Sequence, residues 1–202
     1  MTLSKRIEET AAKMNQNDAE AALFQICAAL DVTATNEYGK SGRSTYKRFV
    51  RDYFQLITRI ALNGPSIGNL HVAYDHPSLE KSADGTVSVE DVFYHVVRCG
   101  LYHEAKLPDD LVFGEEQRIS VINGVLTLPS SLIYGLIAAV VVSPSNAGEW
   151  ISNPLALHVS GFPVPINMLW GKRNELLWLL DVRDELVRIA NTRPQDLTIP
   201  CT

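Results

Sequence analysis

An arginine and a histidine five positions apart, Arg98 and His103, lie near the middle of the chain. Arg98 carries a permanent positive charge and can bind two oxygens of a phosphate at once. The imidazole of His103 can exchange a proton near neutral pH. Side chains of these two types can stabilise charge on a phosphodiester and move the protons that its cleavage requires.

The spacing of this pair carries little information alone, because chance predicts about 0.8 such pairs in a chain of this composition. Its sequence context adds more. Ser88 is a typical helix N-cap, and Asp91 lies in the first turn, where the helix dipole favours an acid. Apolar residues then recur at helical spacing, which predicts a buried helix that reaches His103. Residues five apart on an α-helix lie about 140° apart, so we expect Arg98 and His103 to flank one groove.

Four neighbours are candidates for supporting roles at this site, namely His95, Cys99, Tyr102 and Glu104. His95 can join the groove, whereas Tyr102 and Glu104 fit an orienting role better than a chemical one. A Cys99–His103 nucleophile pair is an alternative. In the structural alternative, His103 is an ordinary helical histidine, and Arg98 only pairs with Glu104, Asp91 or an acid elsewhere.

A second cluster of charge lies in the segment 36–60, which carries six basic and two acidic residues in a chain of net charge −5. The periodicity predicts a helix over 44–62. Its basic side chains have two interpretations, a solvated surface or a site for the phosphates of a nucleic acid. The nucleic-acid-binding candidates are Arg43, Lys47, Arg48 and Arg51.

Composition and length predict an ordinary globular protein, which we expect to form a single domain over 1–202. The longest apolar stretch, 132–142, is too short to span a bilayer, which needs about 20 residues. The N-terminus has charges where a signal peptide is apolar. Three irregularly spaced cysteines indicate a reducing compartment. We therefore expect a cytoplasmic protein with no membrane segment, no metal site and no cofactor.

The predicted fold class is mainly α, with one β-hairpin at about 118–128 around Asn123-Gly124 and a long C-terminal helix at about 168–191. Loops are expected at 31–42 and 109–117. The remaining predicted elements are helices over 3–16, 18–30, 88–103 and about 130–143, and short strands over 70–74 and 155–159.

The segment Phe93-Tyr94-His95-Val96-Val97-Arg98-Cys99-Gly100-Leu101-Tyr102-His103-Glu104 resembles the signature helix of the HEPN superfamily. It is most similar to bacterial relatives with an R-C-G-L-x-H core followed by a hairpin and further helices. The resemblance implies a HEPN-like helical bundle. It also implies a metal-independent ribonuclease that acts as a homodimer, often in toxin–antitoxin or phage-defence systems. Carried over by position, the motif residues are Arg98 and His103.

Two functions are open at this point. The first is a dimeric endoribonuclease in which two copies of His103 serve as acid and base. The alternative is a non-catalytic HEPN-like module that binds RNA, a nucleotide or a co-encoded partner protein. Active members of the superfamily often carry a polar residue after the arginine, and Cys99 at that position favours this alternative.

Overall fold

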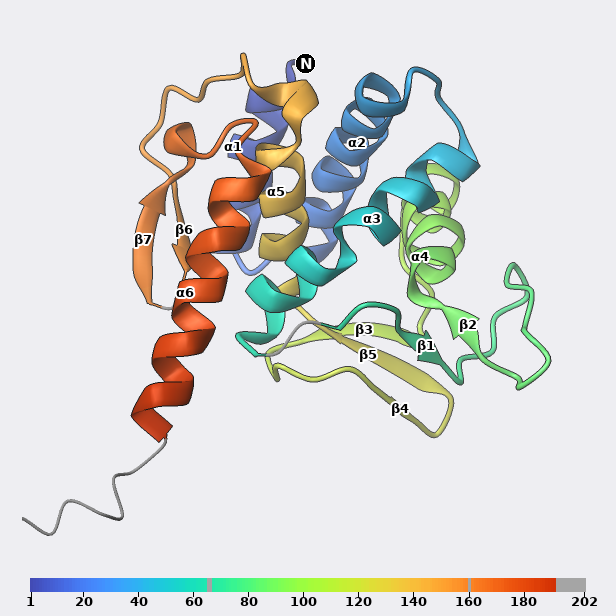
Figure 1. Ribbon diagram of the computed structural model, residues 1–202. Coiled ribbons are helices and arrows are strands. Elements are labelled where there is room, and N and C mark those ends of the chain that lie inside the picture. Colours follow the sequence, from blue (N-terminus) through green and yellow to red (C-terminus); the bar gives the residue numbers. More distant parts are fainter. Residues whose placement is uncertain (65–66, 160, 192–202) are drawn as a thin grey trace, which may run out of the picture.

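The computed structural model describes residues 1–64, 67–159 and 161–191, and it shows a mainly helical protein with small sheets at its edges (Figure 1). The long helices are α1 (Leu3–Asn15), α2 (Ala19–Tyr38), α3 (Arg43–Leu62), α5 (Leu132–Val142) and α6 (Arg173–Asn191). The predicted fold class, mainly α, is confirmed.

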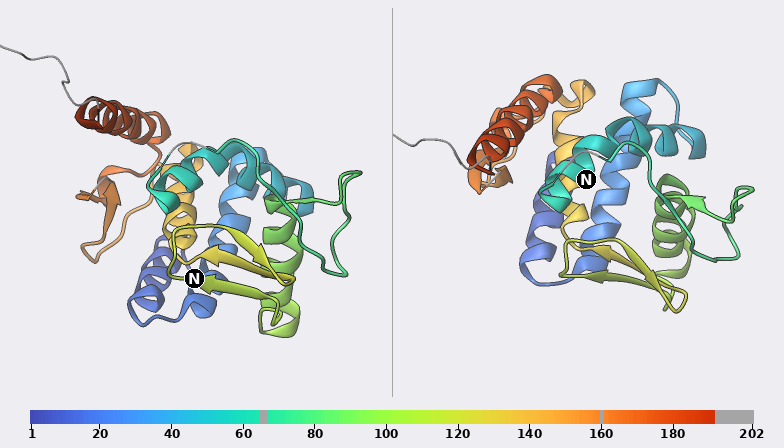
Figure 2. Two further views of the ribbon diagram at one scale, coloured as in Figure 1. Left: turned by 90° about the horizontal axis from the view of Figure 1, so that it is seen from below. Right: turned by 60° about the horizontal axis from the view of Figure 1, so that its bottom comes forward.

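The centre of the bundle is α5, because every residue of this helix except Tyr134 is buried. A helix that is apolar on all sides has no face for water and must be surrounded by other elements. α2 and α3 pack against it, and α1 covers α2. Two further views show this arrangement from below (Figure 2). One continuous apolar core runs from Leu3 in α1 to Leu180 in α6.

The crossing of α3 and α5 depends on a glycine. A Cβ atom on Gly135 would lie 2.4 Å from the carbonyl oxygen of Ile57, so no side chain fits there. The backbones of the two helices therefore approach more closely than any other residue would allow.

The three-stranded sheet covers one end of the bundle (Figure 1). The hairpin of β4 (Ser120–Ile122) and β5 (Val125–Pro129) confirms the prediction at 118–128, and both turn residues, Asn123 and Gly124, have positive φ. The loop predicted at 109–117 was wrong in part. β3 (Leu111–Gly114) forms there and pairs in parallel with β5, a long-range contact that local sequence does not reveal.

The loop predicted at 31–42 was also wrong, since α2 continues to Tyr38 and ends at Gly39, which has the left-handed backbone of a helix cap. Polar side chains disrupt the apolar pattern in this part of α2, but they are paired inside the protein. Thr33 accepts a hydrogen bond from Asn146, and Glu37 accepts one from Ser143. These bonds fix the last turns of α2 to the end of α5.

The C-terminal helix begins at Arg173 rather than at the predicted residue 168, because Gly171 has a φ of +74° and its N–H donates to the carbonyl oxygen of Val141. A 3₁₀ turn, Ile166–Met168, precedes it. The strand predicted at 155–159 is confirmed as β6 (Ala156–Val159). Its antiparallel partner, β7 (Phe162–Pro165), lies outside the elements predicted from the sequence. The predicted strand at 70–74 is shorter, β1 (His71–Val72), and pairs with β2 (Val87–Ser88).

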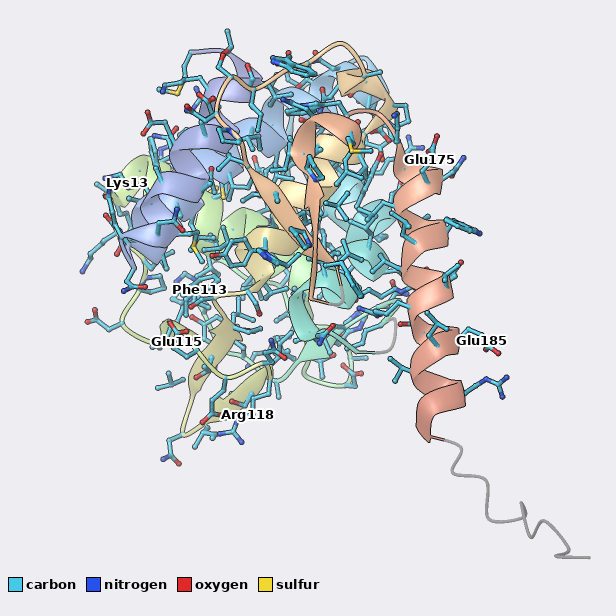
Figure 3. The ribbon with its side chains drawn as sticks, turned by 90° about the vertical axis from the view of Figure 1, so that its left-hand side faces the viewer. Lys13, Phe113, Glu115, Arg118, Glu175 and Glu185 are labelled. Atoms are coloured by element: carbon cyan, nitrogen blue, oxygen red, sulfur yellow. The ribbon has the colours of Figure 1, made fainter. Side chains whose placement is uncertain are left out.

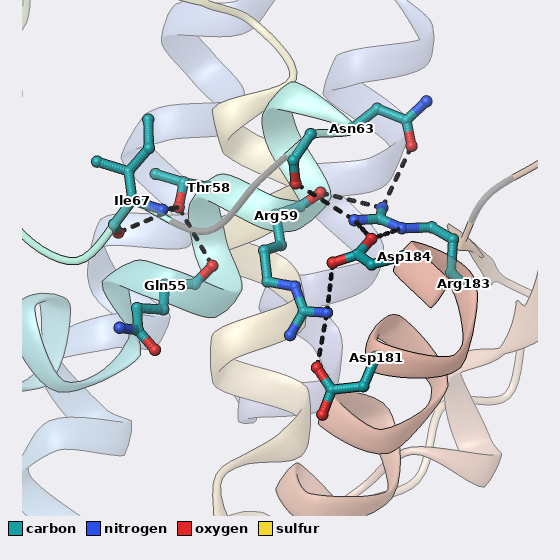
Figure 4. A network of polar contacts seen from close by, with 9 residues as sticks. Gln55, Thr58, Arg59, Asn63, Ile67, Asp181, Arg183 and Asp184 are labelled. Carbon is teal, nitrogen blue, oxygen red and sulfur yellow. Dashed lines mark hydrogen bonds and ion pairs between the residues drawn. The ribbon is translucent and has the colours of Figure 1, made fainter. Parts of the chain in front are cut away.

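Two buried arginines attach α6 to the end of α3 (Figure 4). Arg59 contacts Asp181 and Asp184 at 2.9 and 2.8 Å. Arg183 pairs with Asp184 and donates to the backbone oxygens of Arg59 and Gly64. The carboxylates and backbone oxygens around the two guanidinium groups offset part of the cost of removing these charges from water.

Candidate functional site

The helix that carries Arg98 and His103 begins as predicted. Ser88 caps it, with its hydroxyl accepting from the N–H of Asp91. After the single turn of α4 (Val89–Asp91) the chain becomes π-helical over Val92–Arg98 and again over Gly100–Glu104. Within it, the N–H of Cys99 donates to the carbonyl oxygen of Tyr94, five residues earlier.

This register changes the geometry of the candidate pair. A π-helix bonds residues five apart and turns less per residue than an α-helix. Over ideal π-helical turns the angle between Arg98 and His103 would be smaller than the 140° of an α-helix, and no hydrogen bond or ion pair joins the two side chains in the described part of the chain. π-Helical turns are rare in proteins, and those that form are frequently found at functional sites. The two π-helical segments therefore support Arg98 and His103 as candidate site residues.

Arg98 is held by an acid and two aromatic rings. Its Nε and Nη2 atoms both donate to Oδ2 of Asp31 at 3.1 Å. The guanidinium carbon lies 4.8 Å from the ring centre of Tyr102 and 5.5 Å from that of Tyr94. Burial opposes the charge, but the Asp31 carboxylate and a hydrogen bond to Cys99 outweigh it, so the pKa of Arg98 is raised above its usual value. The side chain is both charged and oriented.

An exposed aromatic pair borders this arginine. Tyr102 stacks on Phe24 of α2 with ring centres 5.0 Å apart, and the two residues are 38% and 39% exposed. Phe24 and Asp31 are seven residues apart and therefore lie on one face of α2. Neither residue was a candidate from the sequence. Extending the helix prediction beyond residue 30 would have placed them together.

His103 and Glu104 are both exposed at the end of the π-helical segment. The helix stops at Ala105, which has a φ of +58°. The chain then folds back so closely that a Cβ atom on Gly100 would lie 3.0 Å from the carbonyl oxygen of Lys106. Gly100 thus permits the tight return that leaves His103 at the open end of the helix.

His95 has different neighbours from Arg98. Its Nε2 atom lies 3.8 Å from Asp91, is buried, and has no hydrogen-bond partner among the described residues. Burial, followed by the charge of Arg43, lowers the pKa of His95, so the neutral ring is favoured. His95 lies beside α3, whereas Arg98 lies against α2, and the structure does not bring these two side chains together.

Cys99 is half-buried and touches Arg98, whereas the second thiol near this site, Cys27, is fully buried. Tyr46 donates a hydrogen bond to the Cys27 sulfur at 3.5 Å. Burial raises the pKa of Cys27 to about 12, which makes this thiol inert as a nucleophile at neutral pH.

The basic side chains of α3 are largely neutralised by acids. Lys47 pairs with Asp91 of α4, and Arg51 pairs with Glu90 at 3.0 Å. Arg48 contacts Asp52 and covers the ring of Tyr38. Arg43 is exposed at the first turn. These candidates do share one surface, but three of the four already have an acidic partner.

Comparison with known proteins adds one relationship. The profile of the Rv1289 family matches residues 2–193. The chain belongs to the Rv1289 family. No curated protein and no solved structure matches the chain. The family match includes every residue of the candidate site.

Metal-ligand clusters and membrane-spanning helices were sought among the described residues of this Rv1289 family member. In this part of the chain, no three His, Cys, Asp or Glu side chains gather in a way that could hold a metal ion. Over the same residues, none of the helices combines the length and the apolar character needed to cross a membrane.

Proposed function

We propose that this member of the Rv1289 family is a HEPN-type endoribonuclease that cleaves RNA as a homodimer, with Arg98 and His103 as its catalytic residues. The observation that carries the proposal is Arg98, which Asp31 orients in a helix whose two π-helical segments, Val92–Arg98 and Gly100–Glu104, end beside the exposed His103. We infer that a phosphate-binding cation and a proton carrier flank the same space.

The chemistry follows from these two groups. The 2′-OH of a ribose loses a proton and attacks the neighbouring phosphorus, and the bond to the 5′-oxygen breaks as that oxygen gains a proton. The products are a 2′,3′-cyclic phosphate and a free 5′-hydroxyl. Arg98 binds the phosphate oxygens as negative charge develops on them. One His103 removes the first proton, and the partner's His103 supplies the second.

A dimer is part of the proposal because the attacking 2′-oxygen and the leaving 5′-oxygen lie on opposite sides of the phosphorus, so that one imidazole does not reach both in the same displacement. A twofold axis brings two copies of one surface together. The exposed stack of Phe24 and Tyr102 beside Arg98 supports this, since aromatic side chains are enriched in protein interfaces. The nearby Asp31 keeps the guanidinium in place before RNA binds.

A second candidate is a non-catalytic module that binds RNA, a nucleotide or a co-encoded partner. The ion pairs support it. Arg98 already has a carboxylate partner, and Lys47 and Arg51 are paired with Asp91 and Glu90. A guanidinium that already shares its charge with Asp31 stabilises a reacting phosphate less, which favours binding without catalysis.

The test is cleavage of single-stranded RNA by the full chain in the presence of EDTA. We expect cleavage with 2′,3′-cyclic phosphate ends, and a loss of about 10²–10⁴-fold in rate for His103→Ala. Arg98→Ala should cause a loss of similar size. His71→Ala and Arg118→Ala, two changes at exposed residues outside the site, should retain the full rate.

The outcomes separate the two candidates. RNA binding without turnover, abolished by Arg98→Ala, would support the non-catalytic module. Cleavage that is equal in wild type, His103→Ala and Arg98→Ala would exclude a catalytic role for both residues, because a contaminating nuclease would then account for the activity.

A further inference from the structure

A cavity of about 560 Å³ lies on a different side of the molecule from Arg98. It is formed where α1, the end of α3, the start of α5 and the β6–β7 hairpin meet, on the face that Figure 3 shows. Ligand sites in proteins have volumes of roughly 300–1,000 Å³, so this cavity has room for a small organic molecule.

The lining of the cavity is apolar at its base and polar at its rim. Ile60 and Ile137 come from α3 and α5, and Leu157 comes from β6. All its lining residues are uncharged apart from the titratable His158, which is exposed. An ion that entered would lose water without gaining a partner of opposite charge. The cavity therefore suits an uncharged molecule.

Tyr134 is the most informative residue of the rim. It is the single residue of α5 that is not buried, and it is 40% exposed in a helix that is otherwise enclosed on all sides. A tyrosine presents an apolar ring and a hydroxyl that can both donate and accept a hydrogen bond. Its position at the rim gives the cavity a stacking surface and a polar contact, and the exposed His158 is a further lining residue.

Two other polar groups at the rim are fixed by the fold. The hydroxyl of Ser131 donates to the carbonyl oxygen of Ala61 at 2.6 Å and keeps its own lone pairs as acceptors. Asn63 accepts from Arg183 of α6 at 3.3 Å. These contacts hold the rim in place, so a ligand would meet a wall that is already formed.

We propose that this cavity binds an uncharged, largely apolar small molecule with a ring system and one or two hydrogen-bonding groups. The ring stacks against Tyr134 above the aliphatic base, and its polar groups contact Ser131 or His158. This site is independent of the proposed ribonuclease. The cavity favours an uncharged ligand, whereas RNA is a polyanion.

The experiment uses Nile red, a neutral dye that shifts its emission to the blue in apolar surroundings. Titration of the full chain should show saturable binding to one site. Ala156→Trp places a large side chain on β6 in the cavity and should weaken binding at least about tenfold, a loss of about 1.4 kcal/mol. Ala11→Trp fills the cavity from α1 and should act in the same way.

Controls identify where the dye binds. Ala83→Trp adds the same side chain to an exposed loop and should bind the dye as wild type does. Leu186→Glu removes an exposed apolar side chain from α6, outside the cavity, and should also leave binding unchanged. Circular dichroism checks that each variant is folded.

Three results would overturn the proposal. The first is the absence of saturable binding. The second is wild-type affinity in both folded cavity variants. The third is a loss of binding in Leu186→Glu alone, which would place the dye on the surface of α6. Tight binding of the anionic dye anilinonaphthalene sulfonate at the same cavity would contradict the assigned ligand class.

Discussion

Single residues decide what the candidate site can do, and Arg98 is the clearest example. Its guanidinium is fixed by Asp31 on one side and by the rings of Tyr94 and Tyr102. Fixing the side chain in advance removes part of the entropic cost of binding a phosphate, while Asp31 competes with that phosphate for the same donors. The strength of the Arg98–Asp31 ion pair determines which of these two effects is larger.

The ion pair of Arg98 and Asp31 should contribute to stability. Both side chains are less than one-third exposed, at 22% and 31%. We expect Asp31→Asn to lower the free energy of unfolding by about 1–2 kcal/mol, because a hydrogen bond to a charged group is lost or weakened. Urea unfolding measures this. In a double-mutant cycle Arg98 should couple to Asp31 and not to the exposed Glu104, and equal coupling to both acids would contradict the assignment.

His95 should make stability depend on pH. Burial and the cations Arg43 and Lys47 lower its pKa, although Asp91 and Glu80 oppose this shift. The folded state therefore resists protonation of His95, while the unfolded chain gains a proton below about pH 6.5. The contribution of neutral His95 to the free energy of unfolding is complete above that pH. It is lost as the pH falls toward the pKa of His95 in the folded state.

Comparison with His95→Gln isolates this contribution. The difference in unfolding free energy between wild type and the variant should shrink as the pH is lowered from 8 to 5, measured by urea unfolding at each pH. A difference that stays constant or grows over this range would show that His95 is not held neutral.

At the level of elements, close packing of helices positions the site. α2 supplies Phe24 and Asp31, and it is fixed at its far end by the bonds of Thr33 and Glu37 to the end of α5. α5 is in turn locked to α3 where Gly135 meets Ile57. The π-helical segments thus pack on α2 and α3, and α5 helps to fix the positions of these two helices.

Gly135→Ala tests this crossing. The new methyl group would lie 2.4 Å from the carbonyl oxygen of Ile57, so the helices must separate. We expect a loss of about 1–3 kcal/mol in unfolding free energy, the usual cost of overpacking. Gly148→Ala is the matched control, because a Cβ atom there meets nothing within 4 Å. Equal stability of the two variants would show that the crossing tolerates more separation than the structure implies.

The sequence was informative about elements wherever the signal was local. Ser88 marked the start of the central helix, and Asn123-Gly124 marked the hairpin. The prediction from the sequence failed where long-range contacts determine the secondary structure. β3 exists because β5 pairs with it, and the last turns of α2 persist because residues just after α5 satisfy their polar side chains. The two π-helical segments that carry Arg98 and His103 also have no signal in the hydrophobic pattern.

At the level of the whole molecule, functional features occupy separate places. The Arg98 surface lies on α2 and the π-helical segment, and the uncharged cavity lies beside α1 and β6. α6 borders neither the ion pair nor its aromatic neighbours, and it is held by Arg59 and Arg183 against the end of α3. Changes at one place should therefore leave the others intact.

The attachment of α6 can be tested through Asp184. Burial opposes its charge, but hydrogen bonds from Arg183 and Arg59 outweigh this effect and lower its pKa. The contribution of Asp184 is present above the unfolded pKa of about 3.9 and is lost as the pH falls through the lower folded value. At neutral pH we expect Asp184→Asn to speed hydrogen exchange in α6.

The matched control is Glu185→Gln, since Glu185 contacts Arg188 of the same helix. This variant should leave exchange in α6 nearly unchanged. Equal exchange in wild type and Asp184→Asn would show that apolar contacts such as Leu176 and Leu180 hold the helix without the ion pairs.

The most direct test of the proposed function is the rate of RNA cleavage in EDTA by wild type and His103→Ala, with His71→Ala as the control for a lost histidine. We expect wild type and His71→Ala to cleave RNA to products that end in 2′,3′-cyclic phosphate. The rate of cleavage by His103→Ala should be at least about 10²-fold lower. Wild-type protein that leaves RNA intact, or His103→Ala that cleaves at the wild-type rate, would contradict it.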